Sequence, residues 1–188
     1  MKQMKSLEHS FLVAMPSLDD SWFEKSVIYI VEDNEFGTMG LVINALNKLT
    51  VQDLLEHFQL PFDETSIEMT RPVFSGGPVD IERGFILHRP VGAWKSSLSL
   101  PDNMAMTVSE DFLTAVSDET APRDYLVCLG FSGWEPNQLA QELQENSWIN
   151  IPFNESLLFE TPIEHRWEIA LATLGITPQS LSTAAGHA

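Results

Sequence analysis

The 188-residue sequence predicts an α+β fold with a mixed or partly closed sheet. Apolar and β-branched runs of strand length come in pairs that short turns separate. Single amphipathic segments with a helical period interrupt these pairs. Strands and helices do not alternate regularly, as the repeating units of a parallel sheet would require.

The first predicted elements are a strand pair. Val27–Val31 is a β-branched run that ends before Gly37, and Leu41–Ile43 follows as its hairpin partner. The next strand, Val73–Phe74, runs into the small-residue turn Ser75–Pro78. Further short strands are expected at Gly84–His88, Leu98–Leu100, Met104–Val108 and Leu157–Phe159.

Three segments of the chain are predicted to form helices, and two of them carry helix-start signals. Thr50 and Asp53 have capping-box spacing, which predicts a helix start. A short helix is expected over Glu110–Val116. Thr161–Glu164 combines an N-cap, a first-turn proline and an acidic third residue. The apolar stripes of the first and last helices are Leu54, Leu55 and Phe58, and Ile163, Trp167, Ala170, Leu171 and Leu174, with Gly175 placed to end the last helix.

The most informative stretch runs from Asp124 to Trp148. Tyr125–Leu129 is an apolar run that leads into the small-residue segment Gly130–Gly133, and an amphipathic segment carrying Leu139 and Leu143 follows. This order predicts a buried strand, a tight turn and a helix. A strand-to-helix turn with little side chain can offer backbone N–H groups to a ligand.

The charge of the chain restricts the classes of partner. The net charge is −17, with 27 acidic against 10 basic side chains, while 44% of residues are hydrophobic. The composition is that of a globular protein, and its negative field repels phosphate backbones and anionic lipid surfaces. Direct nucleic-acid binding and membrane association are therefore not expected, and a partner would be neutral or basic.

Cysteine usage indicates a reducing compartment. Cys128 is the only cysteine, which excludes an internal disulfide, and its apolar neighbours indicate a buried structural thiol. The apolar run Phe11–Met15 is too short to cross a bilayer. We expect a cytoplasmic protein with a single domain over residues 1–188 and a short flexible tail from about residue 182.

Ser132 lies in Gly130–Trp134, which nearly matches the G-x-S-x-G nucleophile elbow. Trp134 replaces the last glycine, and only downstream glutamates and His165 could complete a triad. Ser132 is either a nucleophile or a residue that satisfies the backbone of a turn, and the turn explanation needs fewer conditions.

Two other segments could carry chemistry. Ser75–Pro78 could present N–H groups to an anion, although it lacks the lysine of a P-loop and the G-x-G-x-x-G fingerprint. His88 at a strand end could be a general base or a hydrogen-bonded structural residue. The five histidines have no metal-site spacing, so neither a metal nor a cofactor is expected.

Several segments, in this order and spacing, resemble the AlgH/YqgE family of bacterial proteins: Phe11–Leu18, Ser26–Ile30, Gly40–Asn44, Ser75–Val79, Arg83–His88, Gly130–Trp134, Gln138–Leu139, Asn146–Trp148, Thr161–Ile163 and Ala185–Ala188. The resemblance covers essentially the whole chain. It implies one α+β domain with a bifurcated sheet, partly closed as a small barrel and surrounded by helices. Ala45 and Leu46 stand where the family pattern often has Lys-Pro, and Asn137 stands where it often has glycine.

The resemblance implies no reaction, so two hypotheses remain open. The first is a non-catalytic binding or regulatory module with a protein or small-molecule partner; one family member is named for a proposed role in transcriptional regulation, but the −17 charge argues against direct DNA contact. The alternative is an enzyme or small-ligand receptor with a pocket at the glycine-containing turns. That pocket would use Asn44, Ser75, Gly76, Gly77, Pro78, Arg83, His88, Ser132, Gly133, Trp134 and Glu135.

Overall fold

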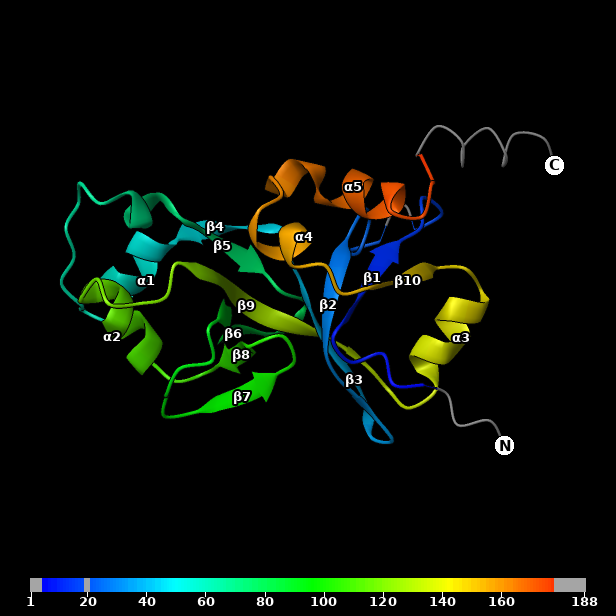
Figure 1. Cartoon of the computed structure of the whole chain (residues 1–188), viewed down its shortest axis with the longest axis horizontal. Helices are drawn as coiled ribbons and strands as arrows, with labels where there is room; N and C mark the ends of the chain where they lie inside the picture. The colour runs from blue at the N-terminus through cyan, green and yellow to red at the C-terminus, as the bar shows by residue number, and fades with distance from the viewer. Residues whose placement is uncertain (1–4, 19–20, 178–188) are drawn as a thin grey trace.

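One long strand, β9 (Asp124–Trp134), belongs to both parts of the sheet (Figure 1). The structure is a computed structural model, and it describes residues 5–18 and 21–177. The end of β9 pairs antiparallel with β3 (Gly37–Val42). Its beginning lies between β5 (Pro72–Ser75), which runs parallel to it, and the antiparallel strand β6 (Val79–Arg89). The sheet is therefore mixed and bifurcated, as predicted.

The remaining strands extend the two arms of the sheet. One arm has the order β10-β1-β2-β3-β9, and the other continues from β9 through β6 and β8 to β7, with β4 attached to β5. The sheet curls into a half-barrel with helices around it (Figure 1). The further strands are β1 (Ser10–Ala14), β2 (Val27–Asn34), β4 (Leu46–Thr50), β7 (Ser97–Leu100), β8 (Met104–Thr107) and β10 (Trp148–Pro152).

The helices are short and lie at the outside of the sheet (Figure 1). The largest apolar cluster takes residues from both arms, including Tyr29 from β2 and Leu87 from β6. Trp167 connects the last helix to the sheet because its indole N–H donates to the Ala14 carbonyl at 2.8 Å. The helices are α1 (Val51–His57), α2 (Asp111–Ser117), α3 (Gln138–Gln144), α4 (Glu155–Phe159) and α5 (Arg166–Ala172), with 3₁₀ turns at Ile67–Thr70 and Ile163–His165.

The predicted start of α1 is confirmed. The Asp53 N–H donates to the Thr50 hydroxyl at 3.4 Å, and the Thr50 N–H donates to the Asp53 carboxylate at 2.8 Å. Leu54 and Leu55 are buried as expected. Phe58 is not part of the buried face, because the helix ends at His57 and Phe58, its C-cap, is 38% exposed.

The predicted tight turn at Gly130–Gly133 is wrong, because β9 continues through it to Trp134. Gly130 has a φ of +75°, which bends the strand without ending it. The following residues then pair with Val79 and with β3, so their backbone groups stay in a ladder. The chain turns instead at Asn137, which has a φ of +69°. Glycine and asparagine adopt this left-handed conformation more readily than other residues.

The C-terminal predictions need two corrections. Leu157–Phe159 belongs to α4 and not to a strand; Asn154 caps this helix by accepting from the Ser156 N–H, and a three-residue apolar run cannot distinguish the two structures. Thr161 does not cap a helix, because its hydroxyl donates to the Ser156 carbonyl. A 3₁₀ turn follows, and α5 begins only at Arg166. The predicted tail from about residue 182 lies outside the described residues.

Gly76 and Gly77 connect β5 to β6 directly on the backbone of β9. A Cβ atom on Gly77 would lie 2.0 Å from the Phe131 carbonyl carbon and oxygen, and one on Gly76 would lie 2.4 Å from the Gly130 carbonyl oxygen. Such distances are far below van der Waals contact. Both positions therefore require glycine because another backbone occupies the side-chain space.

We expect Gly77→Ala to destabilise the fold by about 3 kcal/mol or more, because the methyl group must displace the β9 backbone. Gly84→Ala is the matched control, since a Cβ there meets nothing within 4 Å. It should change stability by no more than about 0.5 kcal/mol. Urea unfolding followed by circular dichroism measures both variants. Equal stability of Gly77→Ala and the parent protein would contradict the packing argument.

Candidate functional site

Ser132 holds the β5–β6 connection against β9. Its side chain is fully buried, and its hydroxyl donates to the Gly76 carbonyl at 3.1 Å. Ser75 lies next to this contact and accepts a hydrogen bond from the Asn47 amide at 3.1 Å. The structure therefore brings Ser75, Gly76, Gly77 and Ser132 together, but through backbone packing that leaves no room for a ligand between them.

Other residues of the predicted pocket do not take part in the contact between Ser132 and Gly76. Asn44 accepts from the Val27 N–H at 2.9 Å and donates to the Lys25 carbonyl at 2.8 Å, so it fixes the start of β2. Pro78 is exposed beside the start of β6. An open depression next to the β2–β3 hairpin is lined by Gly133, Trp134 and Glu135.

His88 is fully buried and hydrogen-bonded through both ring nitrogens. Nδ1 lies 3.0 Å from the Pro90 carbonyl oxygen, which can only accept, so Nδ1 carries the proton. Nε2 then accepts from the Thr107 hydroxyl at 2.7 Å. Phe112 and Trp94 cover the ring, and burial lowers the pKa of the imidazole. No residue contacts both His88 and Ser132 among the hydrogen bonds and ring contacts of the described segments.

His9, which the sequence does not single out, lies between a carboxylate and a phenol hydroxyl. Its Nε2 is 2.6 Å from an Asp102 carboxylate oxygen and its Nδ1 is 2.7 Å from the Tyr29 hydroxyl. Tyr29 is fully buried, and burial raises the pKa of its phenol, so the hydroxyl stays protonated. This polar chain joins the residue before β1 and strand β2 to the β7–β8 turn.

Arg83 lines another cavity, of about 780 Å³, here called the apolar groove. Its apolar lining comes from Leu49, Leu54, Phe58, Ile81, Ile86 and Leu113. The groove exists because β6 bulges away from β9: Val79 pairs with Phe131, but Gly84 already pairs with Leu129. The intervening residues 80–83 are exposed, and Ile81 is 66% exposed.

The rim of the apolar groove is mainly acidic. Asp53, Glu82 and Glu110 supply carboxylates, against the guanidinium of Arg83 and the imidazole of His57. Arg83 forms no ion pair within the described residues and lies 5.3 Å from the centre of the Phe85 ring. An apolar floor with an acidic rim favours an apolar ligand that carries positive charge.

Cys128 is fully buried, and burial raises the pKa of its thiol to about 12. The thiol is therefore protonated and inert at neutral pH. Residues 5–18 and 21–177 contain no group of three histidine, cysteine or acidic side chains positioned to hold a metal ion. None of the helices in these two segments is long and apolar enough to cross a membrane.

A family model described as AlgH-like matches residues 11–179. The chain belongs to the AlgH-like family. The resemblance found in the sequence is thereby confirmed. A UPF0301 protein of Hydrogenovibrio crunogenus is 60% identical over 187 residues, covering 100% of both chains. A UPF0301 protein of Vibrio cholerae is 46% identical over 186 residues, covering 97% of this chain and 100% of that protein.

Two solved structures share the fold of this AlgH-like protein. The solution structure of AlgH from Pseudomonas aeruginosa superposes with a TM-score of 0.77 at 40% identity, with 100% of both chains covered. The crystal structure of protein DIP2367 from Corynebacterium diphtheriae gives a TM-score of 0.70 at 21% identity, covering 92% of this chain and 90% of that one. This second likeness concerns the fold alone.

We expect His88 to make stability fall as the pH falls. The folded protein holds the pKa of His88 below its ordinary value of 6.5, so only the unfolded chain takes up the proton just below that pH. Stability should decline from about pH 6.5 downwards, by at most about 1.4 kcal/mol per pH unit from this group. Urea unfolding between about pH 7.5 and 5 measures the slope.

His88→Asn should flatten this pH dependence, although it lowers stability at neutral pH because two buried hydrogen bonds change. The control is His165→Asn, which alters an exposed histidine and should keep the parental slope. The interpretation fails if His88→Asn and the parent protein lose stability in parallel over this range.

Proposed function

We propose that this AlgH-like protein is a non-catalytic binding module of the cytoplasm, and that its apolar groove accepts a short segment of a protein partner. The observation that carries the proposal is the groove itself, a cavity of about 780 Å³ with the 66% exposed side chain of Ile81 at its edge. Exposed apolar side chains around a cavity with a charged rim are typical of a surface that a partner covers.

The burial of the reactive side chains supports a non-catalytic role. Ser132 and His88 are both fully buried and already hydrogen-bonded to protein groups. The Cys128 thiol is buried and protonated. Since a catalytic group must reach its substrate, the alternative of an enzyme at the glycine-containing turns has less support. A single buried cysteine also suits the reducing cytoplasm.

The charges indicate the chemistry of the partner segment. The chain carries a net charge of −17, and three carboxylates lie on the groove rim. A segment with apolar anchor residues and flanking Lys or Arg would complement both the apolar lining and the acidic rim. The opposite charges would speed the association of the two proteins, and burial of the apolar anchors would slow their dissociation.

Synthetic peptides test this proposal. We expect a leucine- and lysine-containing peptide to bind with a Kd of about 100 μM or tighter, and the same peptide with glutamate in place of lysine not to bind. Ile81→Asp should weaken binding of the cationic peptide at least about 10-fold, because it places a charge on the apolar wall. Isothermal titration calorimetry measures each affinity.

Phe36→Asp is the control, since Phe36 is 83% exposed at the β2–β3 hairpin and does not line the apolar groove. It should leave the affinity unchanged. Equal binding of the two peptides, or equal weakening by Ile81→Asp and Phe36→Asp, would refute docking at the apolar groove. Turnover of any substrate that Ser132→Ala abolishes would refute the non-catalytic role.

A further inference from the structure

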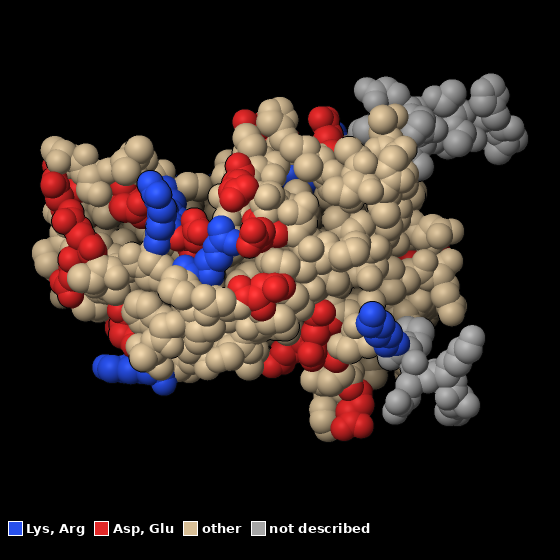
Figure 2. Space-filling view, viewed as in Figure 1, with Lys and Arg blue, Asp and Glu red and all other residues tan. Residues whose placement is uncertain are grey.

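A second cavity, of about 300 Å³, lies between the start of β9 and the α4–α5 region. Arg71, Arg123 and Arg166 line it together, and we call it the arginine pocket. The whole chain has only 10 basic side chains, so three guanidinium groups around one small cavity are a marked local concentration. Figure 2 shows Lys and Arg side chains gathered between the α1 and α4 regions, with acidic side chains around them.

Arg166 is a buried cation without an anionic partner. The residue is 5% exposed; Nε donates to the Thr161 carbonyl at 3.1 Å and Nη1 donates to the Ile43 carbonyl. Over the described parts of the chain, no carboxylate forms an ion pair with it. Burial lowers the pKa of the guanidinium to about 10, and the neighbouring Cys128 and Glu164 oppose this shift only in part. A buried charge of this kind is costly until an anion approaches it.

Arg71 is fully engaged and shapes the pocket wall. Its two terminal nitrogens donate to the Tyr125 carbonyl at 2.8 Å and to the Arg123 carbonyl at 2.9 Å, and its Nε lies 3.1 Å from the Glu68 carboxylate. Its guanidinium also lies 3.8 Å from the centre of the Tyr125 ring. Arg71 therefore fixes the chain segment that presents Arg123.

Two of the nearby carboxylates, those of Glu68 and Asp124, are occupied by other partners. Glu68 pairs with Arg71 and accepts from the Tyr125 hydroxyl at 2.7 Å. Asp124, which also lines the pocket, pairs with Arg89 at 2.8 Å. Arg123 forms no ion pair within residues 5–18 and 21–177. Two guanidinium groups on the pocket, those of Arg123 and Arg166, thus lack a carboxylate partner.

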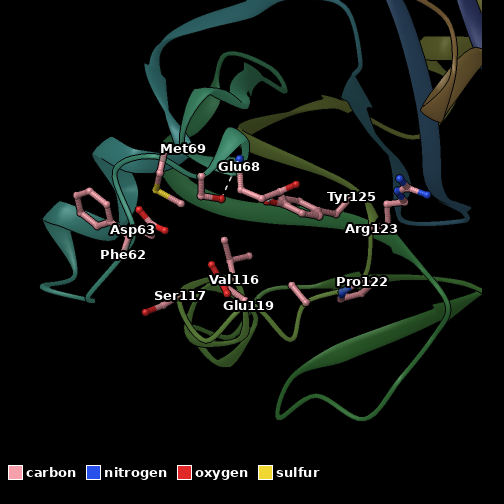
Figure 3. Close-up of a pocket in the computed structure, with 12 residues that line it drawn as sticks. Phe62, Asp63, Glu68, Met69, Val116, Ser117, Glu119, Pro122, Arg123 and Tyr125 are labelled. Atoms are coloured by element: carbon pink, nitrogen blue, oxygen red, sulfur yellow. Dashed lines mark hydrogen bonds between the residues drawn. The ribbon is translucent and has the colours of Figure 1, made fainter.

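A neighbouring cavity of about 510 Å³ shares Tyr125 and Arg123 with the arginine pocket. Figure 3 shows these two side chains at one end of that cavity, with Phe62 and Asp63 at the opposite end. Arg123 is exposed, so its guanidinium is accessible from solution. The arginine pocket therefore combines one accessible and one buried cation.

We propose that the arginine pocket binds a small organic anion, a carboxylate or a phosphate ester that carries a flat apolar group. Arg123 and Arg166 hold the anionic head, since guanidinium groups bind carboxylate and phosphate through paired N–H donors. The apolar group packs against Phe74, Leu158 and Phe159, which line the same cavity. A volume of about 300 Å³ suits a ligand of metabolite size.

Titration of ¹⁵N-labelled protein with benzoate and with phenyl phosphate tests the site and identifies the head group. At least one of them should give saturable shifts of the amides around the pocket, with a Kd of about 1 mM or tighter. Benzamide, which has the same ring without the charge, should give none. Arg123→Gln should weaken binding at least about 10-fold, because it removes one of the two unpaired guanidinium groups.

Arg83→Gln makes the same charge change in the apolar groove and should leave anion binding unchanged. Neither arginine forms an ion pair in the described structure, so both variants should fold. Ile81→Asp should also bind the anion normally, which separates this site from the proposed peptide groove. The inference is overturned if neither anion saturates, if benzamide shifts the same amides equally, or if Arg123→Gln and Arg83→Gln weaken binding to the same extent.

Discussion

The contact between the Gly76–Gly77 connection and the backbone of β9 is the constraint on which the architecture depends. β9 belongs to both arms of the sheet, and the connection lies on it where the strand passes from one arm to the other. The Ser132 hydroxyl adds a buried hydrogen bond to the Gly76 carbonyl. The glycines that the sequence suggests as an anion-binding turn therefore have a structural role at the junction of the sheet. Only residues without a side chain allow the β5–β6 connection to approach the β9 backbone so closely.

This junction also determines where open surface remains. Past the glycines, β6 leaves β9 over residues 80–83, which opens the apolar groove on one side. At the other end of β9, Arg71 donates to the carbonyls of Arg123 and Tyr125, and Arg71 and Arg123 both line the arginine pocket. The two cavities differ in charge: carboxylates dominate the rim of the groove, whereas guanidinium groups dominate the pocket. One strand thus positions two surfaces suited to ligands of opposite charge.

The sequence was informative where local physics decides the structure. The capping box of Thr50 and Asp53, the hairpin partners of β2 and β3, and the strands flanking the turn at residues 101–103 all depend on near neighbours and were predicted correctly. The family resemblance supplied the bifurcated sheet. Leu157–Phe159 was misassigned because its burial is the same in a strand and in a helix, and only the Asn154 cap distinguishes them. The small residues of Gly130–Gly133 predicted a turn, but Gly130 only bends the strand, and the residues after it pair with segments that are distant in sequence.

Long-range contacts account for the site residues that the sequence did not identify. The hydrogen bond to the carbonyl of Ile43 helps to hold Arg166 in its buried position, and because Ile43 is remote in sequence, no spacing rule connects the two residues.

The same contact has a dynamic consequence. Detaching α5 would break the hydrogen bond between the Arg166 guanidinium and the Ile43 carbonyl and the one between the Trp167 indole and the Ala14 carbonyl. The last helix and the C-terminal ends of β1 and β3 should therefore open together as one cooperative unit. Amide hydrogens in these distant segments should then exchange with solvent at matched rates.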